Sequence, residues 1–248
     1  MENYIQPITS EYLKIDTPQM IEVDRLMMDD YHIELIQMME NAGRCLAIVA
    51  REEFLQKDPQ QKRIAVLAGT GGNGGGALVC ARRLHNWGAN VEVFMTDGED
   101  KMTPIPGHQR RILQRIGIPI RSGEELASEN EYDLIIDGVI GYSVKGDPYG
   151  TPMKMINWIN SRAEKVLSLD TPSGLDLTSG TVHNPTVKAD ATLTLAMPKQ
   201  GLFGEEAKKI IGNLFLGDIS VPIELYEEKT LNLQATNIFR HSDIVKIY

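Results

Sequence analysis

A glycine-dense stretch in the first third of the chain constrains the fold more than any other feature. Residues 64–84 read IAVLAGTGGNGGGALVCARRL. The apolar run 64–68 predicts a strand, and the apolar positions within 77–84 fall on one face of a predicted helix. The turn between them carries the glycines Gly69, Gly71, Gly72, Gly74, Gly75 and Gly76. A strand, a glycine turn and a helix in this order present backbone N–H groups at a helix N-terminus, which favours a bound phosphate or other anion.

The glycines themselves have two interpretations. A ligand-binding turn needs glycine because a Cβ blocks the close approach of a ligand and hinders backbone conformations with positive φ. The alternative is a tight strand-to-helix connection without a ligand. The spacing matches neither the dinucleotide fingerprint with its acidic residue about 20 positions on nor a P-loop, which needs Gly-Lys-Ser/Thr.

Beyond the glycine turn, short apolar runs alternate with helical patterns. This alternation predicts an α/β fold: a Rossmann-like three-layer α/β/α sandwich with a mostly parallel sheet. Helices are expected at 106–116 and 152–162. Further strands are expected at residues 91–96, 133–137, 166–170, 191–197 and 214–219.

The N-terminal region is predicted to be helical. Thr17 followed by proline is typical of a helix start, with Thr17 as the N-cap, and a longer helix is expected over 33–54. Inside it, the sequence MENAGR places Gly43 at a position where glycine costs about 1 kcal/mol relative to alanine. Gly43 therefore predicts close packing against another backbone, whereas Glu40 and Asn41 are either solvated or brace a neighbouring loop.

The predicted elements form one domain over residues 1–248. It comprises N-terminal helices in 17–57, an α/β core in 64–222 and a C-terminal tail, 223–248, that packs on the body of the molecule or on a partner. No internal repeat or linker interrupts this order.

Composition narrows the class of protein. The net charge of −9 over 248 residues argues against nucleic acid or an anionic membrane as a partner. Cys45 and Cys80 lie in helix-like apolar patterns, which indicates buried free thiols. The N-terminus lacks the basic and apolar regions of a secretion signal, and no apolar run approaches a membrane span. We therefore expect a cytoplasmic protein.

Acidic residues end two of the predicted strands. Asp137 and Asp170 both precede glycine-containing loops, and the carboxyl ends of parallel strands are where open α/β sheets bind ligands. Each carboxylate could instead simply cap the following loop. Asn73, Asp137 and Ser173 are oxygen donors, a set that suits an alkali or alkaline-earth ion better than zinc. Asp170 could then act as a general acid or base.

Several ordered motifs together resemble the NAD(P)H-hydrate epimerase family, whose fold is the YjeF N-terminal domain. The resemblance extends from about Met20 to Pro222. The motifs that carry it are MENAGR (39–44), GTGGNGGGALVCARRL (69–84), DGVIG (137–141), LDTPSGLD (169–176), MPKQGLFG (197–204) and GDISVP (217–222).

The resemblance implies an enzyme that interconverts the R and S epimers of hydrated NADH and NADPH. It implies a potassium ion bound by Asn73, Asp137 and Ser173, with Asp170 and Asp137 as the catalytic acids. It also implies a homodimer that works beside a separate dehydratase specific for the S form. The residues expected to bind the substrate are Gly72, Asn73, Gly74, Gly75, Gly76, Gly141, Tyr142, Ser143, Val144, Lys145, Gly146, Asp147 and Asp170.

The glycine loop departs from the family's usual GNNGGDG. Gly72 replaces an asparagine, Gly76 an aspartate and Ala77 a glycine, while Tyr142 and Ser143 stand where a Thr-Gly pair is common. Two alternatives to the epimerase are therefore open. One is a non-catalytic nucleotide-binding or scaffold protein on the same fold, and the other is an enzyme acting on a different phosphorylated small molecule.

Overall fold

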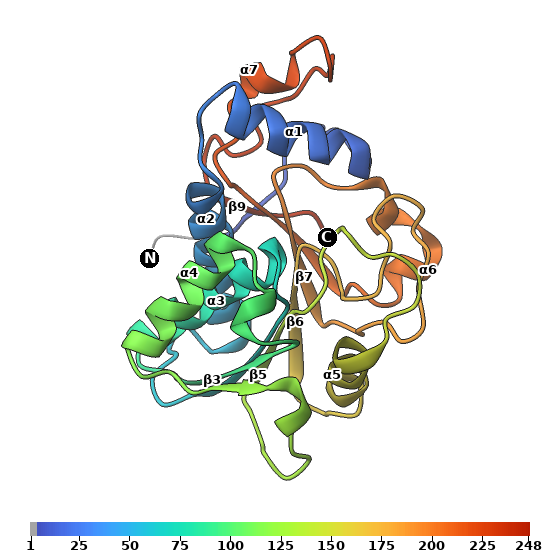
Figure 1. The fold of residues 1–248 in the computed structure, drawn as a ribbon. Helices are drawn as coiled ribbons and strands as arrows, with labels where there is room; N and C mark the ends of the chain where they lie inside the picture. Colours follow the sequence, from blue (N-terminus) through green and yellow to red (C-terminus); the bar gives the residue numbers. More distant parts are fainter. Residues whose placement is uncertain (1–3) are drawn as a thin grey trace.

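The computed structural model describes residues 4–248 as an α/β fold built on one nine-stranded sheet (Figure 1). The strand order is β1-β9-β8-β7-β6-β5-β2-β3-β4, and every neighbouring pair is parallel except β8 and β9. The strands are β1 (Gln6–Pro7), β2 (Arg63–Ala68), β3 (Asn90–Met95), β4 (Ile120–Ser122), β5 (Leu134–Gly138), β6 (Lys165–Leu169), β7 (Ala191–Leu195), β8 (Asn213–Gly217) and β9 (Ile244–Lys246).

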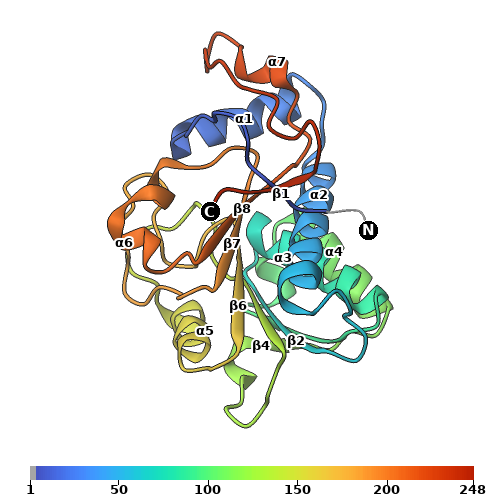
Figure 2. The same cartoon turned by 180° about the vertical axis from the view of Figure 1, so that it is seen from behind.

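Helices cover both faces of the sheet, so the predicted three-layer arrangement is confirmed. Helices α2, α3 and α4 lie on one face and α5 and α6 on the other, while α1 and α7 lie together at one end (Figures 1 and 2). Their bounds are α1 (Thr17–Asp29), α2 (Leu35–Val49), α3 (Gly72–Asn86), α4 (Pro104–Arg115), α5 (Gly150–Asn160), α6 (Glu205–Lys208) and α7 (Ile223–Tyr226). Within residues 4–248, none of the helices combines the length and apolar character that a membrane span requires.

The alternation of side chains along β2 shows how the layers form. Ile64, Val66 and Ala68 are buried in one cluster with residues of α2 and α3. Ala65 and Leu67 belong to a second cluster with residues of α5 on the other face. Because both faces of the strand are covered, its sequence is continuously apolar rather than alternating.

The chain changes direction across the sheet next to β2. From β2 it continues to β3 and β4 on one side, and then returns to place β5 on the other side. The carboxyl ends of β2 and β5 therefore flank the topological switch point, which is where open α/β sheets bind ligands. Asn73 follows β2 and Asp137 lies at the end of β5, so both are close to this point.

Several local predictions were wrong. The N-cap of α1 is Asp16, which forms a capping box with Gln19, and Thr17 is the first helical residue. The long helix expected over 33–54 is present, but its last turn, Ala50–Phe54 after α2, is π-helical. Helix α3 begins at Gly72, so most of the predicted turn is the first turn of the helix. None of the glycines in 69–76 has a positive φ.

Gly43 brings α2 and α3 into close contact, as predicted. A Cβ built on Gly43 would lie 2.4 Å from the Cβ of Val79 and 2.5 Å from the carbonyl oxygen of Gly76, both in α3. Glu40 is not simply solvated: its carboxylate accepts hydrogen bonds from Arg82 of α3 and Gln109 of α4. It therefore braces helices rather than a loop.

We expect Gly43→Ala to destabilise the fold by about 1–3 kcal/mol, the usual cost of overpacking a tight site. The clash outweighs the gain of about 1 kcal/mol in helix propensity. Gly107→Ala in α4 is the matched control, because its added Cβ would have no neighbour closer than 3.6 Å. Urea unfolding of both variants tests this; a Gly43→Ala protein as stable as Gly107→Ala would contradict the close-packing interpretation.

Candidate functional site

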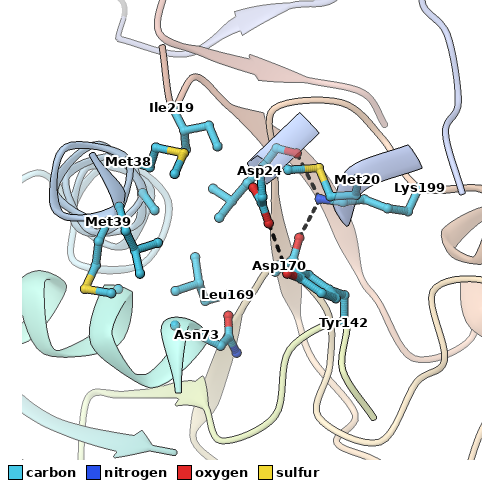
Figure 3. A pocket seen from close by; sticks show the side chains of 15 residues that line it. Met20, Asp24, Met38, Met39, Asn73, Tyr142, Leu169, Asp170, Lys199 and Ile219 are labelled. Atoms are coloured by element: carbon cyan, nitrogen blue, oxygen red, sulfur yellow. Dashed lines mark hydrogen bonds and ion pairs between the residues drawn. The ribbon is translucent and has the colours of Figure 1, made fainter. Parts of the chain in front are cut away.

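A pocket of about 140 Å³ lies at the carboxyl edge of the sheet (Figure 3). Most of its wall is apolar and comes from Met38 and Met39 of α2, Leu169 of β6 and Ile219. The polar side chains that line it are Asp24, Asn73, Tyr142, Asp170 and Lys199. A mostly apolar pocket with a few polar groups is the usual form of a small-molecule site.

Asp170 follows β6 in a strained conformation. Its φ is +62°, a value that is uncommon outside glycine, and its N–H donates to the carbonyl of Leu193 at 2.7 Å. Such strain is retained where the surrounding structure fixes the residue, which happens often at functional sites. The side chain is 7% exposed and lies at the pocket wall.

Lys199 forms a buried ion pair with Asp170. Its ammonium lies 2.7 Å from Oδ1 of Asp170 and also donates to Oγ1 of Thr194 at 3.2 Å and to the carbonyl of Leu195 at 2.9 Å. Both partners of this ion pair are buried. Three acceptors satisfy the three donors of the ammonium, so the pair is fully hydrogen-bonded on the lysine side.

Asp137 is enclosed at the end of β5. Oδ1 accepts hydrogen bonds from Oγ of Ser173 at 2.6 Å and from the N–H of Val139 at 3.3 Å. Oδ2 accepts from Oγ of Ser168 at 2.7 Å and from the N–H of Ser173 at 2.9 Å. Burial raises the pKa of Asp137, and the hydrogen bonds from Ser173 oppose this shift. Within residues 4–248 no basic side chain forms an ion pair with it.

Asn73 lies beside the loop that follows β5. A Cβ on Gly141 would lie 3.0 Å from the Cβ of Asn73 and 3.5 Å from its Oδ1, so glycine at 141 leaves room for the amide. The Nδ2 atom of Asn73 is buried without a hydrogen-bond partner. The described residues contain no cluster of three or more His, Cys, Asp or Glu side chains able to hold a metal.

Different residues of the loop after β5 line two different hollows. Tyr142 lines the pocket of Asp170, whereas residues 143–147 line a neighbouring hollow of about 490 Å³ with Thr70, Thr96 and Asp97. This second hollow lies outside the carboxyl ends of β2, β3 and β5, at the switch point.

The glycines of the loop serve different purposes. A Cβ on Gly74 would lie 1.9 Å from the carbonyl oxygen of Gly69, and one on Gly76 would lie 2.8 Å from Cδ2 of Leu169. Gly74 is therefore needed for packing within the protein, whereas Gly76 lines the pocket and only the end of a flexible side chain lies close to it. Gly72 has no atom within 4 Å of its Cβ position and lines the pocket, so it is open to a ligand.

Two polar residues of the pocket, Asp24 and Lys199, were not predicted from the sequence. Asp24 lies on α1 among the buried positions Met20, Val23 and Met27, and a carboxyl on an apolar helix face is the signal that could have revealed it. Lys199 lies within MPKQGLFG and is almost fully buried, but its pairing with Asp170 depends on tertiary structure.

The chain is similar to known proteins over most of its length. It is 39% identical over 213 residues to the NAD(P)H-hydrate epimerase of Dehalogenimonas lykanthroporepellens, covering 86% of this chain and 84% of that one. It is 32% identical over 216 residues to the NAD(P)H-hydrate epimerase of Entamoeba histolytica, covering 87% and 92%. It also matches the bifunctional NAD(P)H-hydrate repair enzyme Nnr of Moorella thermoacetica at 32% identity, but spans only 42% of that protein.

The fold has a close counterpart among solved structures. The crystal structure of yeast ynu0 (YNL200c) superposes with a TM-score of 0.77 at 24% identity, covering 95% of this chain and all of the yeast chain. The family profile described as YjeF-related protein N-terminus matches residues 35–201. The chain therefore belongs to the YjeF N-terminal family.

Proposed function

We propose that the protein is an NAD(P)H-hydrate epimerase that interconverts the R and S forms of hydrated NADH and NADPH. The observation that carries this proposal is the buried Asp170–Lys199 pair at the wall of a small apolar pocket. A buried ion pair is costly to maintain for stability alone, so it argues against a scaffold without catalysis. The similarity to two epimerases supports the same substrate.

The size of the pocket fits the reacting ring. A cavity of about 150 Å³ holds one benzene ring, so a pocket of about 140 Å³ is of the size of a single six-membered ring. The remainder of the dinucleotide would then lie toward Gly72 and the neighbouring hollow lined by residues 143–147. The N–H groups at the start of α3 would face its phosphates.

Asp170 would accept the proton released from an oxygen at C6. Asp170 forms an ion pair with Lys199, and its carboxylate can accept the proton of the C6 hydroxyl or of an incoming water. Both reversible loss of the hydroxyl and ring opening need such a group. The apolar wall formed by Met38, Met39 and Leu169 limits the access of other water molecules.

The proposed activity is tested by supplying purified R-form hydrated NADH and coupling its conversion to an S-specific dehydratase. We expect conversion well above the spontaneous rate. Folded protein without conversion would shift the assignment to a nucleotide-binding protein or another substrate.

The bifunctional relatives are more than twice as long as the region they share with this chain, which is consistent with a second repair activity in those proteins. A separate dehydratase partner, a homodimer and a cytoplasmic location are further parts of the proposal.

The oxygen atoms around Asp137 support a potassium site. The carboxylate is fully buried and lacks an ionic partner among the described side chains, and the oxygens of Asn73 and Ser173 are donors of the type that potassium prefers. A bound potassium ion would compensate the charge of Asp137. It would also connect the loops that follow β2, β5 and β6.

We expect potassium chloride to raise the unfolding midpoint relative to choline chloride at equal ionic strength. A ligand present at 100 times its Kd adds about 2.7 kcal/mol to the free energy of unfolding. Asn73→Ala should remove this response while leaving the protein folded. Equal midpoints of the wild type in the two salts would contradict the potassium site.

A further inference from the structure

Asp24 is a second carboxyl group at the wall of the pocket. It lies on the inner face of α1, and Figure 3 shows it beside Tyr142 and Asp170. Its Oδ2 accepts a hydrogen bond from the hydroxyl of Tyr142 at 3.0 Å. The inward positions around it on the helix are apolar, so the packing of α1 has no need of a carboxyl there, and burying one costs free energy.

The surroundings of Asp24 favour its protonated form. Burial raises the pKa of Asp24 from 3.8 to about 6, and Asp170 adds to this rise. The hydrogen bond from Tyr142 and the charge of Lys199 oppose it. Burial raises the pKa of Tyr226 on α7, and the charges of Asp218 and Asp24 add to that rise. Asp170, in contrast, is in direct contact with the ammonium of Lys199.

We propose that Asp24 is the general acid of the pocket and that Asp170 is the base, with Tyr142 holding the acid in place. Acid–base catalysis commonly uses two carboxyl groups that lie in different environments. Here one is held by the hydroxyl of Tyr142 and the other is paired with the ammonium of Lys199. This inference rests on the proposed epimerase function. It adds a catalytic residue on α1 and gives Tyr142 a positioning role.

The C6–O bond breaks, its electron pair goes to oxygen, and the oxygen takes the proton of Asp24 and leaves as water. The lone pair of the ring nitrogen forms a C6–N double bond. A water molecule then adds to C6 from the other face, the double-bond pair returns to nitrogen, and the released proton goes to the carboxylate of Asp170. Return of that proton to Asp24 completes the cycle.

Asp24→Asn tests the acid, because asparagine has the same shape but cannot donate a carboxyl proton. We expect kcat to fall about 10²–10⁴-fold, with an unchanged thermal shift by NADP⁺. Between pH 5.5 and 8.5, wild-type kcat should fall as pH rises above about 6, and the residual activity of Asp24→Asn should lack this decline. Asp29→Asn, on the exposed side of the same helix, is the control and should behave as the wild type.

Wild-type kcat in folded Asp24→Asn would overturn the inference and leave the epimerase function intact. Absence of conversion by the wild type would overturn both. If Asp24→Asn fails to fold, Tyr142→Phe decides, because it removes only the hydroxyl. Loss of that hydrogen bond favours protonated Asp24, so the decline in kcat should move to higher pH. An unchanged pH profile in Tyr142→Phe would overturn the inference.

Discussion

Replacing Asp170 by asparagine is expected to lower kcat for epimerisation by about 10²–10⁴-fold, the usual contribution of a positioned acid or base. Asparagine tolerates positive φ well, so the backbone at +62° should be retained. The amide cannot accept a proton from the C6 hydroxyl or from water at neutral pH. The loss should therefore appear in kcat, measured with R-form hydrated NADH and a coupled S-specific dehydratase.

Asp176→Asn provides the matched control for this variant. Asp176 belongs to the same loop segment, but its carboxylate accepts hydrogen bonds from the N–H groups of Thr178 and Ser179, which is ordinary turn chemistry. Asparagine supports such turns equally well, so activity should be unchanged. Turnover by folded Asp170→Asn at the rate of Asp176→Asn would remove Asp170 from the mechanism.

The sequence was sufficient to predict where the strand-end residues meet. Because parallel strands share one carboxyl edge, residues that end β2, β5 and β6 had to lie near one another. The hydrogen bonds between Asp137 and Ser173 follow from this register. The pattern of apolar residues was equally informative for the long central strands, whereas the short edge strands β1, β4 and β9 carry too few residues to show one.

The packing partners of the glycines and the positions of Asp24 and Lys199 in the pocket wall could not be predicted from the sequence. A dense run of glycines predicts a close approach without saying what approaches, and at Gly74 it is the backbone of Gly69. The apolar face of α1 could have marked Asp24 as buried, but only the tertiary docking of α1 across the carboxyl ends of the strands brings it to the pocket. Lys199 turns back toward Asp170 after Ala196, whose φ is +61°.

Lys199→Met should be the most destabilising single change in the pocket. Removing one partner of a buried ion pair leaves an uncompensated charge and typically costs about 3–5 kcal/mol. Asp170 would keep only the weak contact with Oγ1 of Thr194 at 3.3 Å. For a chain of this size each kcal/mol lowers the unfolding midpoint by about 2–4 °C, which calorimetry resolves easily. Lys209→Met, at an exposed pair with Glu206, should leave the midpoint unchanged.

The double variant Asp170→Asn with Lys199→Met separates the structural role of the lysine from its role in catalysis. With both charges removed, nothing ionic remains to be desolvated, so the double variant should unfold at a higher temperature than Lys199→Met alone. Coupling between contacting residues is typically about 0.5–3 kcal/mol. Its epimerase activity should nevertheless stay at the level of Asp170→Asn, because stability is regained without the base. If Lys199→Met were as stable as the wild type, or the double variant no more stable than Lys199→Met, the ion pair would not be what holds Asp170 at the pocket wall.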